Sequence, residues 1–450
     1  MRVVRNYLLW NTKLIGDRTG QIQFSSVISV AIVSARILSI WQAHSLSTHL
    51  SPRSSMFQSG WFTVLLIAAA AMIGQAFGRF SYGVLLPAVR DDLGISNTLA
   101  GFLGAANVGA YLLGTLFVAW ATNQLRLLTV FRFGLVLAVA GLFAASVADT
   151  PIVLAAGLFT AGLGGACLWI PAPAIAADAL PHHQRHLAVG LMSSGIGLGI
   201  ACVSMLSGSL RASLGDQAWS NVYEIQFGIG LVVLIAALLI VRHQQELPSG
   251  SGGIGGFRAL RRTRGWLSLI VAYSCFGFMY LLVIGFLTTR LEDDSGWSSN
   301  DAAFAFTTMG IAMIFGGPVF VAMARRQGVR LALSVAFGLW PLFVGIVLSG
   351  HYAATLIACV GLGFLFSALP TLVTLYVVEN ATGQDYGPGV AAATLTFGLA
   401  QTFSPAVGGY LADLSRSFTL VFLLSGTFSS LIHRFAFCVR QMSPYFLVLR

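Results

Sequence analysis

Charged residues are scarce in this chain. Only 9% of its 450 residues are Asp, Glu, Lys or Arg, whereas about 25% is typical of a soluble protein. Hydrophobic residues make up 56%, and the mean hydropathy is +0.82. Such a composition supplies too few polar side chains to cover a water-exposed surface. It excludes a soluble enzyme and indicates a protein whose principal partner is the lipid bilayer.

Lysine is almost absent: Lys13 is the one lysine, and the remaining positively charged residues are arginines. A Walker A loop needs a lysine that follows a glycine-rich run, and no such run precedes Lys13. We therefore exclude ATP hydrolysis at a loop of this type. The cysteines are scattered through apolar runs and are interpreted as small buried hydrophobic residues. They are Cys167, Cys202, Cys275, Cys359 and Cys438.

Acidic residues are missing from the middle of every long apolar run. The HExxH and GxSxG motifs are also missing, and no pair of carboxylates or His/Asp dyad lies at one depth. The sequence therefore predicts no catalytic residue, no metal site and no cofactor. We expect a protein that is not an enzyme.

Twelve apolar runs are long enough to span a bilayer, which takes about 20 residues per helix. They predict an all-α membrane protein with twelve transmembrane helices in two pseudo-symmetric six-helix halves. Short sequence motifs that recur about 200 residues apart support this internal repeat. Phe77-Gly78, for example, recurs as Phe276-Gly277. The runs lie near 61–89, 98–121, 125–147, 152–177, 188–210 and 222–241, then 266–288, 302–324, 331–349, 353–378, 388–412 and 418–439.

The predicted organisation follows from these runs. Residues 56–241 form the first half, the Gly/Ser-rich segment 242–264 is a cytoplasmic linker, and residues 265–440 form the second half. The N-terminal extension 1–55 is either disordered, as a transit peptide would be, or the product of a start codon assigned too early, with Met56 the true beginning. The last run meets His433 and Arg434, so the twelfth helix either ends early or carries a foreign tail, and 441–450 is a tail.

Arginine sets the orientation. If the N-terminus is cytoplasmic, arginine accumulates in the inner loops, which predicts both termini in the cytoplasm. This bias accounts for most of the net charge of +10, so no nucleic-acid partner is expected. We expect a monomer in a bacterial inner membrane, acting on a small-molecule substrate. The outer loops hold only Arg90, Arg211, Arg290 and Arg416.

Arg79 is the clearest functional candidate. At about 1.5 Å per residue it lies about 16 Å from Arg90 along the first helix, too deep to reach water easily. Gln75, Arg79 and Tyr82 are spaced i, i+4 and i+7, which predicts one polar helix face. A guanidinium at this depth either binds a carboxylate or phosphate or has a structural role, and both alternatives stay open.

Polar and aromatic pairs in other spans indicate the same kind of interior. Each pair has the simpler alternative of a hydrogen bond between helices, but together they predict a polar and aromatic cavity that binds substrate. They are Asn107 with Tyr111, Tyr273 with Tyr280, and Thr394 with Gln401.

The first two spans resemble the start of the major facilitator superfamily, and more narrowly its YbfB/YjiJ-type branch. The resemblance rests on GRFSYGVLLP and AANVGAYLLG. It implies a secondary transporter that works by alternating access. The loop ATNQLRLL lacks the acidic residue and the glycine that the superfamily usually has there, so the inner gate must be built differently. The matching residues are Gly78, Arg79, Phe80, Tyr82, Leu85, Leu86, Pro87, Asn107, Tyr111 and Gly114.

One buried cation without a buried acid leads to the functional prediction. We expect a secondary transporter of a small organic anion, and any proton that is moved would travel with that anion. The alternative is efflux of uncharged amphipathic compounds through the aromatic cavity, as in drug export.

Overall fold

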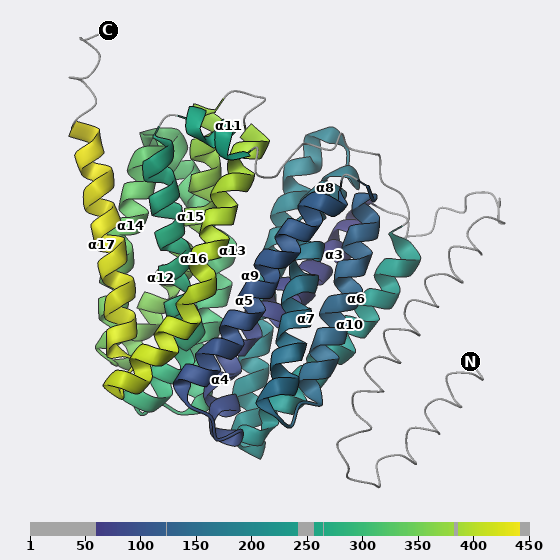
Figure 1. The fold of residues 1–450 in the computed structure, drawn as a ribbon, viewed down its shortest axis with the longest axis vertical. Coiled ribbons are helices and arrows are strands. Elements are labelled where there is room, and N and C mark those ends of the chain that lie inside the picture. Colours follow the sequence, from purple (N-terminus) through teal and green to yellow (C-terminus); the bar gives the residue numbers. More distant parts are fainter. Residues whose placement is uncertain (1–59, 123, 242–255, 264, 382–385, 442–450) are drawn as a thin grey trace, which may run out of the picture. The chain divides into compact units, whose positions relative to one another are not determined.

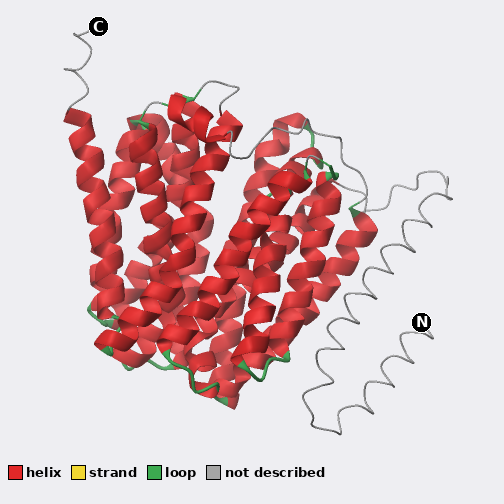
Figure 2. Cartoon of the chain, in the orientation of Figure 1, coloured by secondary structure: helices red, strands yellow, loops and turns green. Residues whose placement is uncertain are grey.

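A computed structural model describes residues 60–122, 124–241, 256–263, 265–381 and 386–441. Within these ranges the regular secondary structure is helical, as Figure 2 shows. The predicted extension 1–55, most of the linker and nearly all of the tail lie outside the described residues.

The first half contains six long helical segments (Figure 1). The first segment joins two α-helices through a π-helical stretch, and the fourth is interrupted near a pair of prolines. The elements are α3 (Gly60–Ala71), η2 (Met72–Phe80), α4 (Ser81–Asp92), α5 (Asn97–Ala121), α6 (Leu127–Ser146), α7 (Pro151–Trp169), α8 (Ala172–Asp178), η3 (His182–Gln184), α9 (Arg185–Leu214), η4 (Asp216–Ala218) and α10 (Trp219–Ile240).

The second half also contains six long segments, and a short helix, α11, precedes them within the predicted linker 242–264. The expected two sets of six are therefore present. The elements are α11 (Gly256–Arg262), α12 (Trp266–Thr289), η5 (Arg290–Asp294), α13 (Ser299–Gln327), α14 (Val329–Leu348), α15 (Tyr352–Asn380), α16 (Tyr386–Ser415) and α17 (Thr419–Gln441).

Eleven helical segments of the described residues are long and apolar enough to cross a membrane. The twelfth long helix, α17, is outside that set, in keeping with the polar residues expected to interrupt it. It does not end at them, however. His433 lies within the helix with Nδ1 2.8 Å from the carbonyl oxygen of Ser334 on α14. A hydrogen bond to a neighbouring helix allows the polar ring to lie at this position.

The two halves pack through α4 with α12, α5 with α16, and α9 with α13. Glycine makes this close approach possible. A Cβ on Gly101 would lie 2.2 Å from the carbonyl oxygen of Pro405, and one on Gly197 would lie 2.5 Å from that of Gly310. Any larger side chain would force the helices apart. The high glycine content thus serves close helix contact between halves as well as within them.

Two ion pairs join the halves at one end of the bundle, which we name the latched end. Arg90 at the end of α4 donates to both carboxylate oxygens of Asp293 in η5. Arg211 near the end of α9 donates to both oxygens of Glu292, at 2.8 Å each. Each pair has the two-point geometry that gives Arg–carboxylate contacts their strength.

Asp413 adds a third link at the latched end. Its carboxylate accepts hydrogen bonds from the backbone N–H groups of Asn97 and Thr98, at 3.1 and 2.7 Å. These groups begin α5 and have no acceptor within their own helix. Ser96 caps the same helix end by accepting from the N–H of Leu99. A carboxylate from the second half therefore helps to cap a helix of the first.

The helix contacts extend from the latched end to the middle of the bundle. Between α5 and α16, for example, Gly409 lies against Asn97 near the latched end, and Gly398 lies against Leu112 in the middle of the bundle. The last pair lines the cavity described below. The halves are thus closed on one side of that cavity, as expected for one end state of the alternating access that the resemblance implies.

We predict that Glu292→Gln opens the latched end. The substitution removes the charge of Glu292, which pairs with Arg211 of the other half. Each ~1.4 kcal/mol by which the closed state is destabilised raises the open fraction about tenfold. The reporter is Thr394→Cys in the cavity, in a chain without the five native cysteines. A membrane-impermeant maleimide added on the latched side should label it faster in the variant.

Asp216→Asn is the matched control, since Asp216 also binds Arg211 but belongs to the same half. It should leave the labelling rate unchanged. Equal rates in the two variants would contradict the assignment of a latch.

Candidate functional site

A cavity of about 190 Å³ lies between the halves. Helices of both halves line it, including η2, α5 and α9 from the first and α12, α15 and α16 from the second. Its lining contains no Asp, Glu or His. Seven of the nine predicted site residues line it: Gln75, Arg79, Tyr111, Tyr273, Tyr280, Thr394 and Gln401.

Arg79 supplies the positive charge of the cavity. Its Nη2 donates to the hydroxyl of Tyr280, at 3.0 Å, and to Oε1 of Gln401. Its Nη1 lies 3.5 Å from Oε1 of Gln75. The guanidinium carbon stands 4.3 Å from the ring centroid of Tyr111, within cation–π range. Every partner that the structure gives Arg79 is neutral.

The backbone around Arg79 is π-helical. The stretch η2 carries i→i+5 hydrogen bonds, a geometry that is rare and is found frequently at functional sites. Gln75 is held by the first half itself, because its Nε2 donates to the carbonyl oxygen of Gly165 at 3.3 Å. Arg79 is therefore positioned by its own half and reaches across to the other.

Aromatic rings form the wall of the second half. Tyr273 and Phe397 stack with centroids 4.6 Å apart, and Tyr280 and Phe397 lie nearly parallel at 5.6 Å. Phe276 stacks on Tyr280 at 5.1 Å. The wall is therefore a stack of aromatic rings, and the hydroxyl of Tyr280 in this stack accepts from Arg79.

The structure does not bring the other two predicted residues into this cavity. Tyr82 donates to the carbonyl oxygen of Ala100 at 2.8 Å. Asn107 is buried, and its Nδ2 donates to the carbonyl oxygens of Gly78 and Leu158, at 2.8 and 2.6 Å. These bonds hold helices of the first half together.

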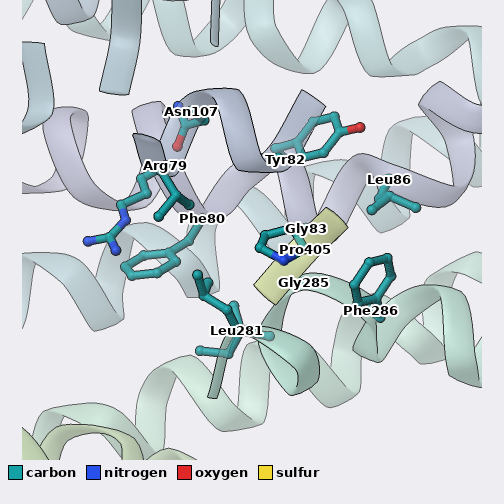
Figure 3. Close-up of a pocket in the computed structure, with 13 residues that line it drawn as sticks. Arg79, Phe80, Tyr82, Gly83, Leu86, Asn107, Leu281, Gly285, Phe286 and Pro405 are labelled. Atoms are coloured by element: carbon teal, nitrogen blue, oxygen red, sulfur yellow. The ribbon is translucent and has the colours of Figure 1, made fainter. Parts of the chain in front are cut away.

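Tyr82 and Asn107 instead line a neighbouring pocket of only about 30 Å³, which Arg79 borders (Figure 3). In that view the guanidinium of Arg79 and the hydroxyl of Tyr82 point in opposite directions. The α-helical spacing that predicted a shared face does not hold, because the wider turns of η2 shift the register before Tyr82.

Sequence reasoning missed Phe397, Phe276 and Trp169, which also line the cavity. An apolar residue in an apolar helix gives no contrast from which to pick it out. One signal was available for Phe397: it lies three residues after Thr394 and four before Gln401, hence on the same helix face. The hydroxyl of Thr394 itself donates to its own helix, at the carbonyl oxygen of Val390.

Among the described residues, no group of three His, Cys, Asp or Glu side chains is placed to hold an ion.

The sequence model of the family described as "Uncharacterised MFS-type transporter YbfB" matches residues 71–433. The chain belongs to this family. The resemblance noted in the first two spans is confirmed. With its membrane-spanning helices, the chain is a multi-pass membrane protein and a secondary transporter of the major facilitator superfamily.

Curated relatives are similar over most of their length. The uncharacterized MFS-type transporter YtbD of Bacillus subtilis is 25% identical, covering 76% of this chain and 88% of the relative. Monocarboxylate transporter 4 of Rattus norvegicus is also 25% identical, covering 82% and 80%. The cis,cis-muconate transport protein of Acinetobacter baylyi is 21% identical, covering 83% and 93%.

Solved structures confirm the predicted fold. A bacterial homologue of the human lysosomal transporter Spinster, in an inward-facing and unoccupied conformation, superposes with a TM-score of 0.69 at 15% identity. The match covers 86% of this chain and 98% of that one. The nucleoside transporter NupG gives 0.70 at 12% identity, covering 86% and 100%. At these identities the likeness shows the fold alone.

We predict that Asn107→Leu weakens the fold and leaves substrate affinity unchanged. The substitution removes two hydrogen bonds to carbonyl oxygens of neighbouring helices, each worth about 0.5–1.5 kcal/mol. Thermal unfolding of the purified protein, followed by tryptophan fluorescence, should shift to lower temperature. Thr160→Val is the control, since that hydroxyl donates to its own helix at Ala156. A raised KM with an unchanged melting temperature would return Asn107 to the binding site.

Proposed function

We propose that this transporter carries small organic anions and that Arg79 binds their carboxylate. The observation that carries the proposal is a guanidinium that lines the cavity between the halves and has only neutral partners. A half-buried cation without a counter-ion favours an anionic ligand, which Arg binds through two parallel hydrogen bonds.

The relatives support this substrate class. Two of them carry names that state transport of monocarboxylates and of cis,cis-muconate, which are organic anions. The size of the cavity also supports it, because about 190 Å³ is below the roughly 300–1,000 Å³ typical of pockets for drug-sized ligands.

Proton movement, where it occurs, is part of the same proposal. The cavity lining offers no carboxylate or imidazole to relay a proton. A proton that accompanies the anion would therefore travel with the substrate. An imposed pH gradient would then drive accumulation.

The arginine bias gives the proposed orientation. With both termini cytoplasmic in an inner membrane, the latched end faces outward, and the cavity is closed from outside. Each chain supplies both walls of its cavity from the two halves at 56–241 and 265–440, so we propose a monomer as the working unit and no enzymatic step.

Efflux of uncharged amphipathic compounds is the second candidate. The stacked wall of Tyr273, Phe397 and Tyr280 favours it, since flat aromatic surfaces suit apolar ligands. On that reading Arg79 would be structural.

Uptake of labelled small organic anions into proteoliposomes, with and without a pH gradient, tests the proposal. We predict that Arg79→Gln reduces uptake at least about tenfold, because hydrogen bonds to a charged group contribute about 1.5–3 kcal/mol each. Arg79→Lys should retain part of the activity, since lysine keeps the charge but lacks the fork.

Arg326→Gln is the control, because it removes the same charge from an exposed position on α13. It should transport as wild type does. Anion uptake that persists in Arg79→Gln would refute the assignment of Arg79. Folded protein that moves uncharged dyes but no anion would favour the efflux alternative.

A further inference from the structure

Gln401 makes a hydrogen bond between the halves at the site itself. Its Oε1 accepts from Nη2 of Arg79 on η2 and from the hydroxyl of Tyr280, at 2.6 Å for the second. Gln401 is 1% exposed, on α16 of the second half. An amide oxygen thus lies where an acceptor for the guanidinium is needed.

Arg79 is only half satisfied along the edge that Gln401 occupies. Its Nε lies next to Nη2 in the guanidinium fork, is buried, and has no hydrogen-bond partner in the structure. A carboxylate has two oxygens that match two adjacent N–H groups of arginine. An amide has one oxygen. Gln401 therefore supplies one of the two acceptors and leaves Nε without one.

We propose that Gln401 is a neutral, tethered substitute for the substrate carboxylate. In the empty carrier it binds Arg79. The arriving anion displaces it, takes over Nη2 with one oxygen and engages Nε with the other. This inference rests on the proposed function, because it requires an anionic substrate held by Arg79.

The bond between Gln401 and Arg79 affects the step in which the empty carrier returns. An empty carrier must pass through a closed state to return, and a buried cation without a partner makes that passage costly. Gln401 supplies a partner from the opposite half, three residues from Gly398, whose contact with Leu112 joins α16 to α5 beside the cavity. The empty carrier can then return, so the protein performs net transport and is not restricted to exchange.

A neutral side chain is the suitable choice at this position. A glutamate would bind Arg79 through two charged hydrogen bonds, as the substrate does, and would compete with it permanently. An apolar residue would leave the cation bare in the empty carrier. Glutamine bonds more weakly than a carboxylate and more strongly than an apolar side chain.

Gln75 has a different role, although it also contacts Arg79. It lies one turn away on the same helical stretch, and its amide is fixed to Gly165 of the same half. Its relation to Arg79 does not change when the halves move. It positions the guanidinium and does not act as a displaceable ligand.

The test compares two modes of transport in proteoliposomes with a labelled small monocarboxylate. Net uptake into empty vesicles requires return of the empty carrier, whereas exchange in vesicles preloaded with the same anion does not. We predict that Gln401→Leu lowers net uptake and keeps exchange, so that the ratio of exchange to net uptake rises about tenfold for each 1.4 kcal/mol added to the return step. The variant should also bind the anion more tightly, because Gln401 no longer competes for Arg79. Tighter binding is measured as a larger rise in melting temperature when the anion is added.

Gln401→Glu should lose both modes, because a fixed carboxylate holds Arg79. Gln401→Asn, which is too short to reach the guanidinium in the same way, should behave as Gln401→Leu does and replaces it if that variant does not fold. Thr402→Val is the matched control on the same helix, since the Thr402 hydroxyl donates to its own helix at Gly398. Its ratio should equal that of wild type.

The outcomes separate this inference from the proposed function. Wild type that transports anions, with the same ratio in Gln401→Leu, would overturn the role of Gln401 alone. Weaker anion binding in Gln401→Leu, with both modes reduced equally, would also overturn it and make Gln401 a direct substrate ligand. Folded wild type that moves no anion in either mode would overturn both.

Discussion

The half-buried positive charge of Arg79 is the constraint on which the rest of the site depends. A guanidinium at this depth is costly unless its N–H groups find acceptors. The first half supplies Gln75 and the face of Tyr111, and the second half supplies Tyr280 and Gln401. One charge therefore requires groups from both halves, which ties substrate binding to their relative position.

Charged and neutral contacts between the halves are found at different places. At the latched end, Arg90 and Asp293 are partly exposed, so water replaces their partners on opening and the net cost is small. Arg211 and Glu292 are more buried and cost more to separate. At the cavity, the hydrogen-bond partners of Arg79 are amide and hydroxyl groups, which we propose that an incoming anion displaces. The strong, charged contacts between the halves therefore lie at the latched end, and the weaker, neutral contacts lie at the cavity.

Composition and spacing predicted the spans and the depth of Arg79, because a charge in an apolar run is visible without a structure. Seven of the seventeen residues that line the cavity were among those predicted. The helix face on which Tyr82 lies was not predictable, because a prediction based on 3.6 residues per turn does not include the wider π-helical turns of η2. Phe397 was hidden by its apolar surroundings. The pairing of Arg79 with Gln401, 322 positions away, is a tertiary fact that no local pattern contains.

The repeat of about 200 residues places a symmetric scaffold around an asymmetric site. The position that corresponds to Arg79, after Phe276-Gly277, is Phe278, and Gln401 corresponds to Cys202. Charge and its neutral partner therefore occur once per chain, and aromatic rings fill much of the opposite wall. One guanidinium neutralises one carboxylate. If Arg79 binds the substrate as proposed, a dicarboxylate would keep one charge uncompensated in the cavity unless it carried a proton. We therefore propose monocarboxylates or singly protonated diacids as substrates.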